Sequence, residues 1–270
     1  MGRGHESSAR DLLDFYIEAG ADALVGEKPV DRFAAGDVVL PARAPNPATA
    51  RAEPAAGTPS PVAPPAPDEA AMAARDIAKR AATLDELRAG LDRFEGCALK
   101  ATATQLVFAD GNPQARLMFV GEAPGRDEDI EGLPFVGRSG KLLDRMLAAI
   151  GFDRTSVYIA NIVPWRPPGN RTPTPQETQI CLPFIQRQIE LVNPDVLVTL
   201  GNPSTQTLLS TREGIMKTRG KWFDYDTGAR TIRAMATFHP AYLLRSPSYK
   251  RMSWQDLRAI AKALEQAPSA

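Results

Sequence analysis

The chain has 270 residues, 43% of them hydrophobic, and its 32 Lys and Arg residues balance 32 Asp and Glu residues. This length suits one large domain or one domain with an appendage, and no apolar run approaches the roughly 18 residues that a membrane span needs. The N-terminus lacks the apolar core of a signal peptide, and the sequence contains two cysteines, Cys97 and Cys181. We therefore expect a cytoplasmic protein without a disulfide framework.

The zero net charge conceals an uneven distribution. Residues 212–262 contain 11 basic and 4 acidic side chains, whereas residues 1–94 contain 11 basic and 15 acidic ones. A basic face near the C-terminus suits a polyanion such as nucleic acid, although a solvated basic surface explains the charge equally well.

The first 67 residues divide into two parts. Apolar residues recur at helical spacing between Ala9 and Leu24, which predicts an amphipathic helix in an N-terminal segment of residues 1–40, suited to docking on a protein partner. Residues 41–67 contain nine prolines and one bulky aliphatic residue, Val62. Such a segment cannot bury enough apolar surface to fold, so we expect a flexible N-terminal extension ending in a disordered linker, followed by a domain over residues 68–270.

Helical and strand patterns follow the linker in a regular order. Residues 68–79 and 83–94 have helical periodicity, and Thr83 with Glu86 predicts a capping box. Strands are then expected at 116–121, 156–161 and 195–201, and a hairpin at 221–240 turns at 226–228 and provides a fourth. Helices are expected at 139–151, 174–192, 202–210 and 253–266. Thr174 and Glu177 predict a capping box for the second of these, and Pro183 is expected to kink or split it. This alternation predicts an α/β protein whose open, mostly parallel sheet is covered by helices on both faces.

Ligands of such sheets bind beyond the carboxyl ends of the strands. The expected strands end in glycine or polar residues: Gly121-Glu122-Ala123, Asn161, Gly201-Asn202 and His239. The loop after the first strand, GEAPGRDEDIEGLPFVG, is glycine-rich like a phosphate loop, but its five acidic residues would repel a phosphate. Taken singly, Asn161 is typical of a turn and His239 of a cap. Together with Phe135 at one rim, they provide an amide, an imidazole and an aromatic face, which suit a planar base.

Three motifs resemble those of the family 4 uracil-DNA glycosylases, the bacterial and archaeal type. They are GEAPGRDEDIEGLPFVGRSGKLL, YIANIVPWRPPGNRTPTPQE and HPAYLLR. The resemblance covers about residues 94–262. It implies the uracil-DNA glycosylase fold, a four-stranded parallel sheet flanked by helices. It also implies a monofunctional hydrolase that releases uracil from deoxyuridine in DNA and leaves an abasic site for base excision repair.

The resemblance places six residues around the uracil ring: Gly121, Glu122, Ala123, Phe135, Asn161 and His239. Phe135 would stack on the ring, while Asn161 would accept from N3–H and donate to O4, a pattern that cytosine does not present. His239 would donate to O2, where negative charge develops as the glycosidic bond breaks. A carboxylate must orient water toward an oxocarbenium-like sugar, and we expect Glu122, or secondly Asp127, to do so. The best-known uracil glycosylases have an aspartate at the position of Ala123.

The base must leave the duplex before it can react. An apolar wedge after His239, formed by Tyr242, Leu243 and Leu244, would fill the gap, although both leucines also suit a core. The expected DNA contacts are Arg138, Ser139, Tyr242, Leu243, Leu244, Arg245, Lys250 and Arg251. We expect a monomer that acts on single- or double-stranded DNA in the bacterial cytosol or nucleoid.

Family 4 enzymes hold an iron–sulfur cluster with four cysteines, and this chain departs from that pattern. The matching positions are Cys97, Lys100, Trp165 and Cys181. Neither an ammonium nor an indole ligates iron, so we expect no cluster, no metal and no other cofactor. Trp165 would fill much of the vacated volume, Lys100 would bind nearby carbonyl groups, and the two thiols would lie close together.

Three rival functions remain open. A non-catalytic binder of uracil-containing or abasic DNA would not need the complete set of site residues. A covalent, suicide-type relative would carry an additional basic loop with its own histidine after PFVG, but GRSGKLL follows directly here. A broader glycosylase would also remove hypoxanthine or thymine, which the sequence does not exclude.

Overall fold

The computed structural model describes residues 67–266, which belong to one compact unit. The amphipathic helix predicted between Ala9 and Leu24 and residues 41–66 of the expected linker lie outside the described residues.

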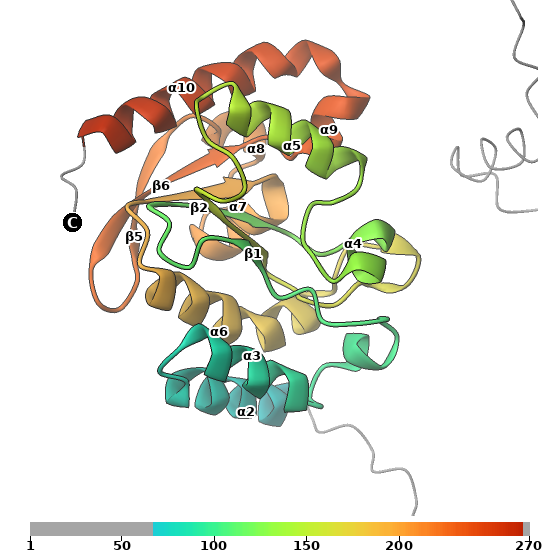
Figure 1. Ribbon diagram of the computed structural model, residues 1–270. Coiled ribbons are helices and arrows are strands. Elements are labelled where there is room, and N and C mark those ends of the chain that lie inside the picture. The colour runs from blue at the N-terminus through green and yellow to red at the C-terminus, as the bar shows by residue number, and fades with distance from the viewer. Residues whose placement is uncertain (1–66, 267–270) are drawn as a thin grey trace, which may run out of the picture. The chain divides into compact units, whose positions relative to one another are not determined.

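The described residues form a six-stranded sheet with strand order β1-β3-β2-β4-β6-β5 (Figure 1). The strands are β1 (Asp110–Gly111), β2 (Leu117–Gly121), β3 (Tyr158–Asn161), β4 (Val196–Leu200), β5 (Trp222–Asp226) and β6 (Thr231–Thr237). The four central strands run parallel, as predicted, and β1 and β5 add antiparallel edges. The expected count of four was therefore too low. β1 has two residues, which is too short to produce a sequence pattern, and β5 is the first arm of the predicted hairpin.

Helices cover both faces of the sheet (Figure 1). One face carries α5 (Arg138–Ala148) and α10 (Lys250–Gln266), and the other carries α6 (Pro175–Val192) with α2 (Pro67–Arg80) and α3 (Leu84–Arg93). Residues of β2 alternate between the two cores: Leu117 and Phe119 pack with α5 and α10, whereas Met118 and Val120 pack with α6. Because both faces are covered, the central strands read as continuous apolar runs.

The helix caps follow the local sequence closely. Thr174 and Glu177 form the predicted reciprocal capping box at the start of α6. At α3 half of the predicted box is present: the Glu86 N–H donates to Oγ1 of Thr83, but the Glu86 carboxylate accepts from the N–H of Ala82 instead. The predicted split at Pro183 is wrong, since α6 continues over 18 residues. A proline removes one N–H from the helix, and the buried face of α6 keeps the remainder in place.

Short helices follow β2, β4 and β6 along the chain. They are α4 (Arg126–Glu131), α7 (Asn202–Leu208) and α9 (Pro240–Arg245), with α8 (Ile215–Thr218) and the 3-10 segments η1 (Ala98–Ala101), η2 (Pro168–Asn170) and η3 (Pro247–Tyr249) elsewhere. Since all four parallel strands end at the same edge, their following loops meet there. Among the described residues, no helix is long and apolar enough to cross a membrane.

Candidate active site

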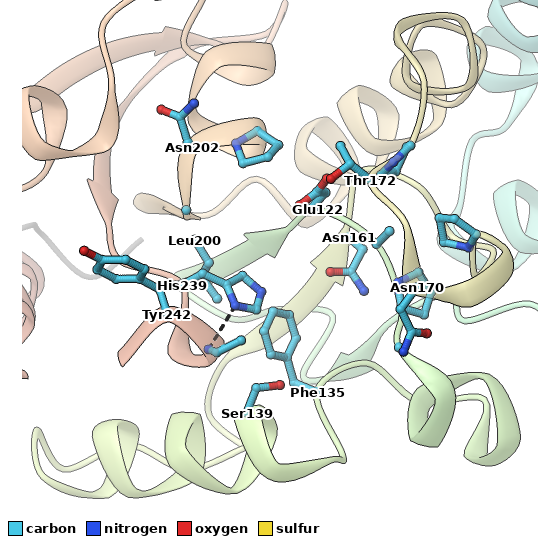
Figure 2. Close-up of a pocket in the computed structure, with 18 of the residues that line it drawn as sticks. Glu122, Phe135, Ser139, Asn161, Asn170, Thr172, Leu200, Asn202, His239 and Tyr242 are labelled. Carbon is cyan, nitrogen blue, oxygen red and sulfur yellow. Dashed lines mark hydrogen bonds between the residues drawn. The ribbon is translucent and has the colours of Figure 1, made fainter. Parts of the chain in front are cut away.

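A cavity of about 630 Å³ lies at the carboxyl edge of the sheet, and residues that follow all four parallel strands line it. Glu122 follows β2, Asn161 ends β3, Asn202 follows β4 and His239 follows β6 (Figure 2). The parallel topology therefore brings together side chains that are more than a hundred positions apart in the chain. The predicted site residues Ala123, Phe135, Ser139, Tyr242 and Arg245 also line the cavity.

Gly121 allows the amide and the aromatic ring to converge. It pairs in register with Asn161 across β2 and β3. A Cβ atom at Gly121 would lie 2.4 Å from Oδ1 of Asn161 and 2.6 Å from Cζ of Phe135. Any larger residue would displace one of these two groups, so the last residue of β2 must be glycine for the cavity to keep its shape.

His239 is a neutral imidazole with a defined tautomer. It caps α9, and its Nδ1 accepts a hydrogen bond of 3.1 Å from the Ala241 N–H. Burial, and secondarily the charge of Arg245, lowers the pKa of His239 to about 4. A neutral ring that accepts at Nδ1 carries its proton on Nε2. His239 therefore offers one N–H donor, and its ring centroid lies 5.4 Å from that of Phe135 at an interplanar angle of 32°.

Three residues that line the cavity each have a buried side-chain oxygen without a hydrogen-bond partner among the described residues. They are Glu122 (Oε1), Asn161 (Oδ1) and Asn202 (Oδ1). Buried polar atoms in folded proteins are nearly always paired, so these acceptors point to a ligand that carries N–H or O–H donors. Burial also raises the pKa of Glu122 above its ordinary value.

The acidic loop between β2 and α5 uses part of its charge to support its own backbone. The buried carboxylate of Glu128 accepts hydrogen bonds of 3.0 Å from the N–H groups of Gly125, Val136 and Gly137. Asp129, also buried, accepts hydrogen bonds of 2.8 and 2.9 Å from the N–H and the hydroxyl group of Thr104, which lies between η1 and β1. Asp127 is exposed and is not among the residues that line the cavity. Two of the five acids in the loop therefore have a structural role.

The residues expected to contact DNA do not all lie at the surface of the protein. Arg138, Lys250 and Arg251 are exposed outside the cavity lining, and Leu244 is 36% exposed. Leu243 is 1% exposed, so its side chain packs in the interior, which favours the core alternative over the wedge for this residue. Adjacent residues of a helix point in directions about 100° apart, and in α9 Leu244 faces outward while Leu243 packs inside.

One wall of the cavity was not anticipated from the sequence. It consists of residues that follow β3: Pro167, Asn170, Arg171, Thr172 and Pro173. Arg171 anchors this wall to α6 through two bonds to Glu177, at 2.8 and 2.7 Å. Glu177 was interpreted as a helix cap alone. The opposite charge of Arg171, six residues earlier, was the signal that could have indicated its second contact.

Comparison with known proteins identifies the family. The family model of the uracil DNA glycosylase superfamily matches residues 108–258. The type-4 uracil-DNA glycosylase of Thermotoga maritima is 46% identical over 174 residues, which cover 64% of this chain and 86% of the relative. Those of Saccharolobus solfataricus and Archaeoglobus fulgidus are 40% and 38% identical, covering 68% and 67% of this chain and 86% and 92% of the relatives.

The chain belongs to the type-4 uracil-DNA glycosylase family. The resemblance drawn from the three motifs is thereby confirmed, and the region matched by the family model contains Glu122, Phe135, Asn161 and His239. Cys97 lies before that region.

The residues at the four cysteine positions of the family do not fit an iron–sulfur cluster here. The Sγ atoms of Cys97 and Cys181 lie 3.9 Å apart, and both cysteines are buried and free. Trp165 is 2% exposed and shares their apolar cluster. The Lys100 ammonium donates to the Asp92 carbonyl at 2.7 Å and forms an ion pair with Glu95. Two thiols and no further ligand at these positions fall short of the four thiolates that such a cluster takes.

Proposed function

We propose that this chain is a monofunctional uracil-DNA glycosylase, which hydrolyses the N-glycosidic bond of deoxyuridine in DNA and leaves an abasic site. One observation carries the proposal. In a member of the type-4 family, the cavity joins a neutral imidazole donor, an amide with an unpaired oxygen and an aromatic ring. The amide complements the edge of a flipped uracil, the aromatic ring complements its face, and the imidazole complements the oxygen on which charge develops.

Asn161 would read the base. Its Oδ1 atom is buried and unpaired, which supports an acceptor for uracil N3–H, while its amide nitrogen donates to O4. Cytosine presents an acceptor at N3 and a donor at N4, so both contacts would be reversed. A buried amide with mismatched partners rejects the wrong base strongly, because its polar groups remain unpaired.

His239 would stabilise the leaving group. As the bond between N1 and C1′ breaks, its electron pair moves onto the base and charge accumulates on O2. A neutral Nε2–H aimed at that oxygen donates a hydrogen bond to the developing charge. Such a donor in a buried site contributes about 3–4 kcal/mol to catalysis.

Glu122 would act on the sugar side. The C1′ centre becomes cationic, and a carboxylate nearby stabilises it and orients the attacking water. The water adds to C1′ and gives up a proton to solvent, while the departing uracil anion takes up a proton from solvent, so the products are neutral uracil and an abasic sugar. The unpaired Oε1 and the raised pKa of Glu122 support this role over that of the exposed Asp127.

The surrounding surface suits DNA. Arg245 lines the cavity, and Lys250 and Arg251 are exposed beside α9, where they could contact phosphates. Leu244 and Tyr242 are the candidates for the group that replaces the flipped base. We further propose a monomer that acts on cytosolic DNA, with residues 1–40 serving as a docking segment for a protein partner.

We also propose that the reaction needs no cofactor. Two of the four cysteine positions hold Lys100 and Trp165, and the roles proposed above for Glu122, Asn161 and His239 require no metal. The contacts of Lys100 and the burial of Trp165 support a packed structure in place of a cluster.

A turnover assay tests the proposal and its rivals. The full-length protein is incubated with a tenfold excess of labelled oligonucleotide containing one uracil, and strand cleavage at abasic sites is measured after alkali. We expect several turnovers on uracil and little or none on thymine, hypoxanthine or xanthine. Tight binding without uracil release would favour a non-catalytic binder, and an SDS-resistant protein–DNA adduct would favour a covalent relative. Either result would overturn the proposal.

A further inference from the structure

Phe135 has a backbone conformation that its side chain disfavours. Its φ angle is +56°, in the left-handed region, where a bulky aromatic residue is uncommon. The residue is 4% exposed, and Figure 2 shows its ring between His239 and Asn161. A strained residue in a site persists only when its surroundings hold it there.

The carbonyl side of this loop is held by one arginine. Arg154 donates from Nη1 to the Pro134 carbonyl at 3.1 Å and from Nη2 to the Phe135 carbonyl. The guanidinium is itself fixed by two carboxylates, at 2.7 Å from Asp144 and 2.6 Å from Asp110. Asp110 belongs to the two-residue strand β1, so this short edge strand provides one of the two anchors.

The amide side of the loop is held by an acid. Glu128 accepts from the N–H groups of Val136 and Gly137, both at 3.0 Å. Close packing confines the loop further, because a Cβ atom at Gly140 would lie 1.6 Å from the Phe135 carbonyl oxygen. Successive peptide groups on both sides of Phe135 are therefore bonded to charged side chains, Glu128 from the same loop and Arg154 from the segment after α5.

We infer that Arg154, together with Glu128, positions Phe135 by stabilising its left-handed backbone, and thereby keeps the ring where a flipped uracil stacks. Arg154 is not among the residues that line the cavity, so its effect on the reaction runs through Phe135. A guanidinium suits this task because its planar fork bonds two carbonyls and two carboxylates at once, which an ammonium cannot do. The inference rests on the proposed uracil-DNA glycosylase activity.

A double-mutant cycle tests the inference. The variants are Arg154→Ala, Phe135→Ala and their combination, and the readouts are the single-turnover rate of uracil release and the affinity for an oligonucleotide containing 2′-fluoro-deoxyuridine. We expect Arg154→Ala to lower the rate about tenfold in the presence of Phe135, but less than about twofold in the Phe135→Ala background, where no ring remains to be positioned. Affinity for the fluorinated probe should follow the same pattern.

The matched control is Arg116→Ala. Arg116 directly precedes β2, at the amino ends of the parallel strands and therefore at the end of the sheet opposite the cavity. Its side chain donates hydrogen bonds to Asp195 and to the Leu264 carbonyl. Its removal should lower the melting temperature without changing the single-turnover rate of the folded protein. If Arg154→Ala does not fold, Arg154→Lys carries the same cycle, since lysine retains the charge but cannot reach both carbonyls.

Two outcomes would overturn the inference. Equal rate losses from the Arg154 substitution in both backgrounds would mean that it acts independently of the ring, and an unchanged rate would mean that Phe135 needs no such support. A wild-type protein that releases no uracil would instead refute the proposed function, which makes the two failures distinguishable.

Discussion

The N–H of Ala241 donates a hydrogen bond of 3.1 Å to Nδ1 of His239. This contact uses the helix N-terminus of α9 to select the imidazole tautomer, because the ring nitrogen that accepts cannot also carry the proton. Burial lowers the pKa of the same ring to about 4, so both effects produce one species near neutral pH: a neutral ring with Nε2–H as its donor.

Replacing His239 should therefore remove a leaving-group donor and little else. His239→Ala should lower the single-turnover rate of uracil release on the order of 10²–10³-fold, in line with the loss of one donor to a developing oxyanion. Binding to uracil-containing DNA, measured by fluorescence anisotropy, should change little. A variant that retains nearly the full rate would exclude His239 from the mechanism.

The pH dependence of the rate should reflect Glu122 before His239. The pKa of Glu122 is raised from 4.5 by burial, whereas that of His239 is about 4. As pH falls, the carboxylate is protonated first, so the single-turnover rate should decline with a midpoint above 4.5 and show no inflection near 6.5. In Glu122→Gln, the remaining rate should decline only near pH 4. An inflection near 6.5 that disappears in His239→Gln would contradict this order.

Glu122→Gln should also separate activity from stability. A folded-state pKa above the unfolded value means that ionisation costs stability, and this cost develops as pH rises from 4.5 through the raised pKa. The variant should melt at a higher temperature than the wild type at pH 7 and at nearly the same temperature at pH 4, while uracil release is reduced. Equal melting temperatures at pH 7 would mean that the carboxylate is not destabilised by burial.

Asn161 should control the choice of base. Asn161→Asp should weaken uracil excision and introduce some activity on cytosine, because a carboxylate accepts from the cytosine amino group. Asn161→Ala should lose uracil excision without gaining cytosine excision, and it serves as the control. Unchanged uracil excision by Asn161→Ala would show that another group reads the base.

The core around the two free cysteines should depend on Trp165. Trp165→Ala should destabilise the fold by about 3–5 kcal/mol through the cavity it creates, as measured by urea unfolding. Trp254→Ala is the matched control, since Trp254 is 41% exposed and Trp165 is 2% exposed.

We expect the purified wild-type protein to be colourless, free of stoichiometric iron and insensitive to chelators. A brown protein with about four irons per chain would show that other residues complete a ligand set.

The central strands and most long helices were predictable because their signals are local. Continuous apolar runs marked β2, β3 and β4, and the Thr174–Glu177 pair marked the start of α6. The positions of Glu122, Asn161 and His239 at one rim also followed, since parallel strands end at a common edge. The three motifs determined the family in the same way, from residues that are contiguous in the chain.

Other features depended on contacts between distant segments, which no local pattern encodes. β1 is a strand because it pairs with β3, and the wall at residues 167–173 is anchored by Arg171 to Glu177 on α6. Packing of α9 decided that Leu243 is buried while Leu244 faces outward.

The clearest case is Phe135. The sequence by itself determined that an aromatic residue lies within a glycine-rich loop, but the left-handed backbone of this residue is disfavoured locally. That conformation exists because Arg154, 19 residues further along, bonds to its carbonyl. Tertiary structure decided this feature because the energy that offsets the local strain comes from groups brought together only when the sheet and its helices have formed.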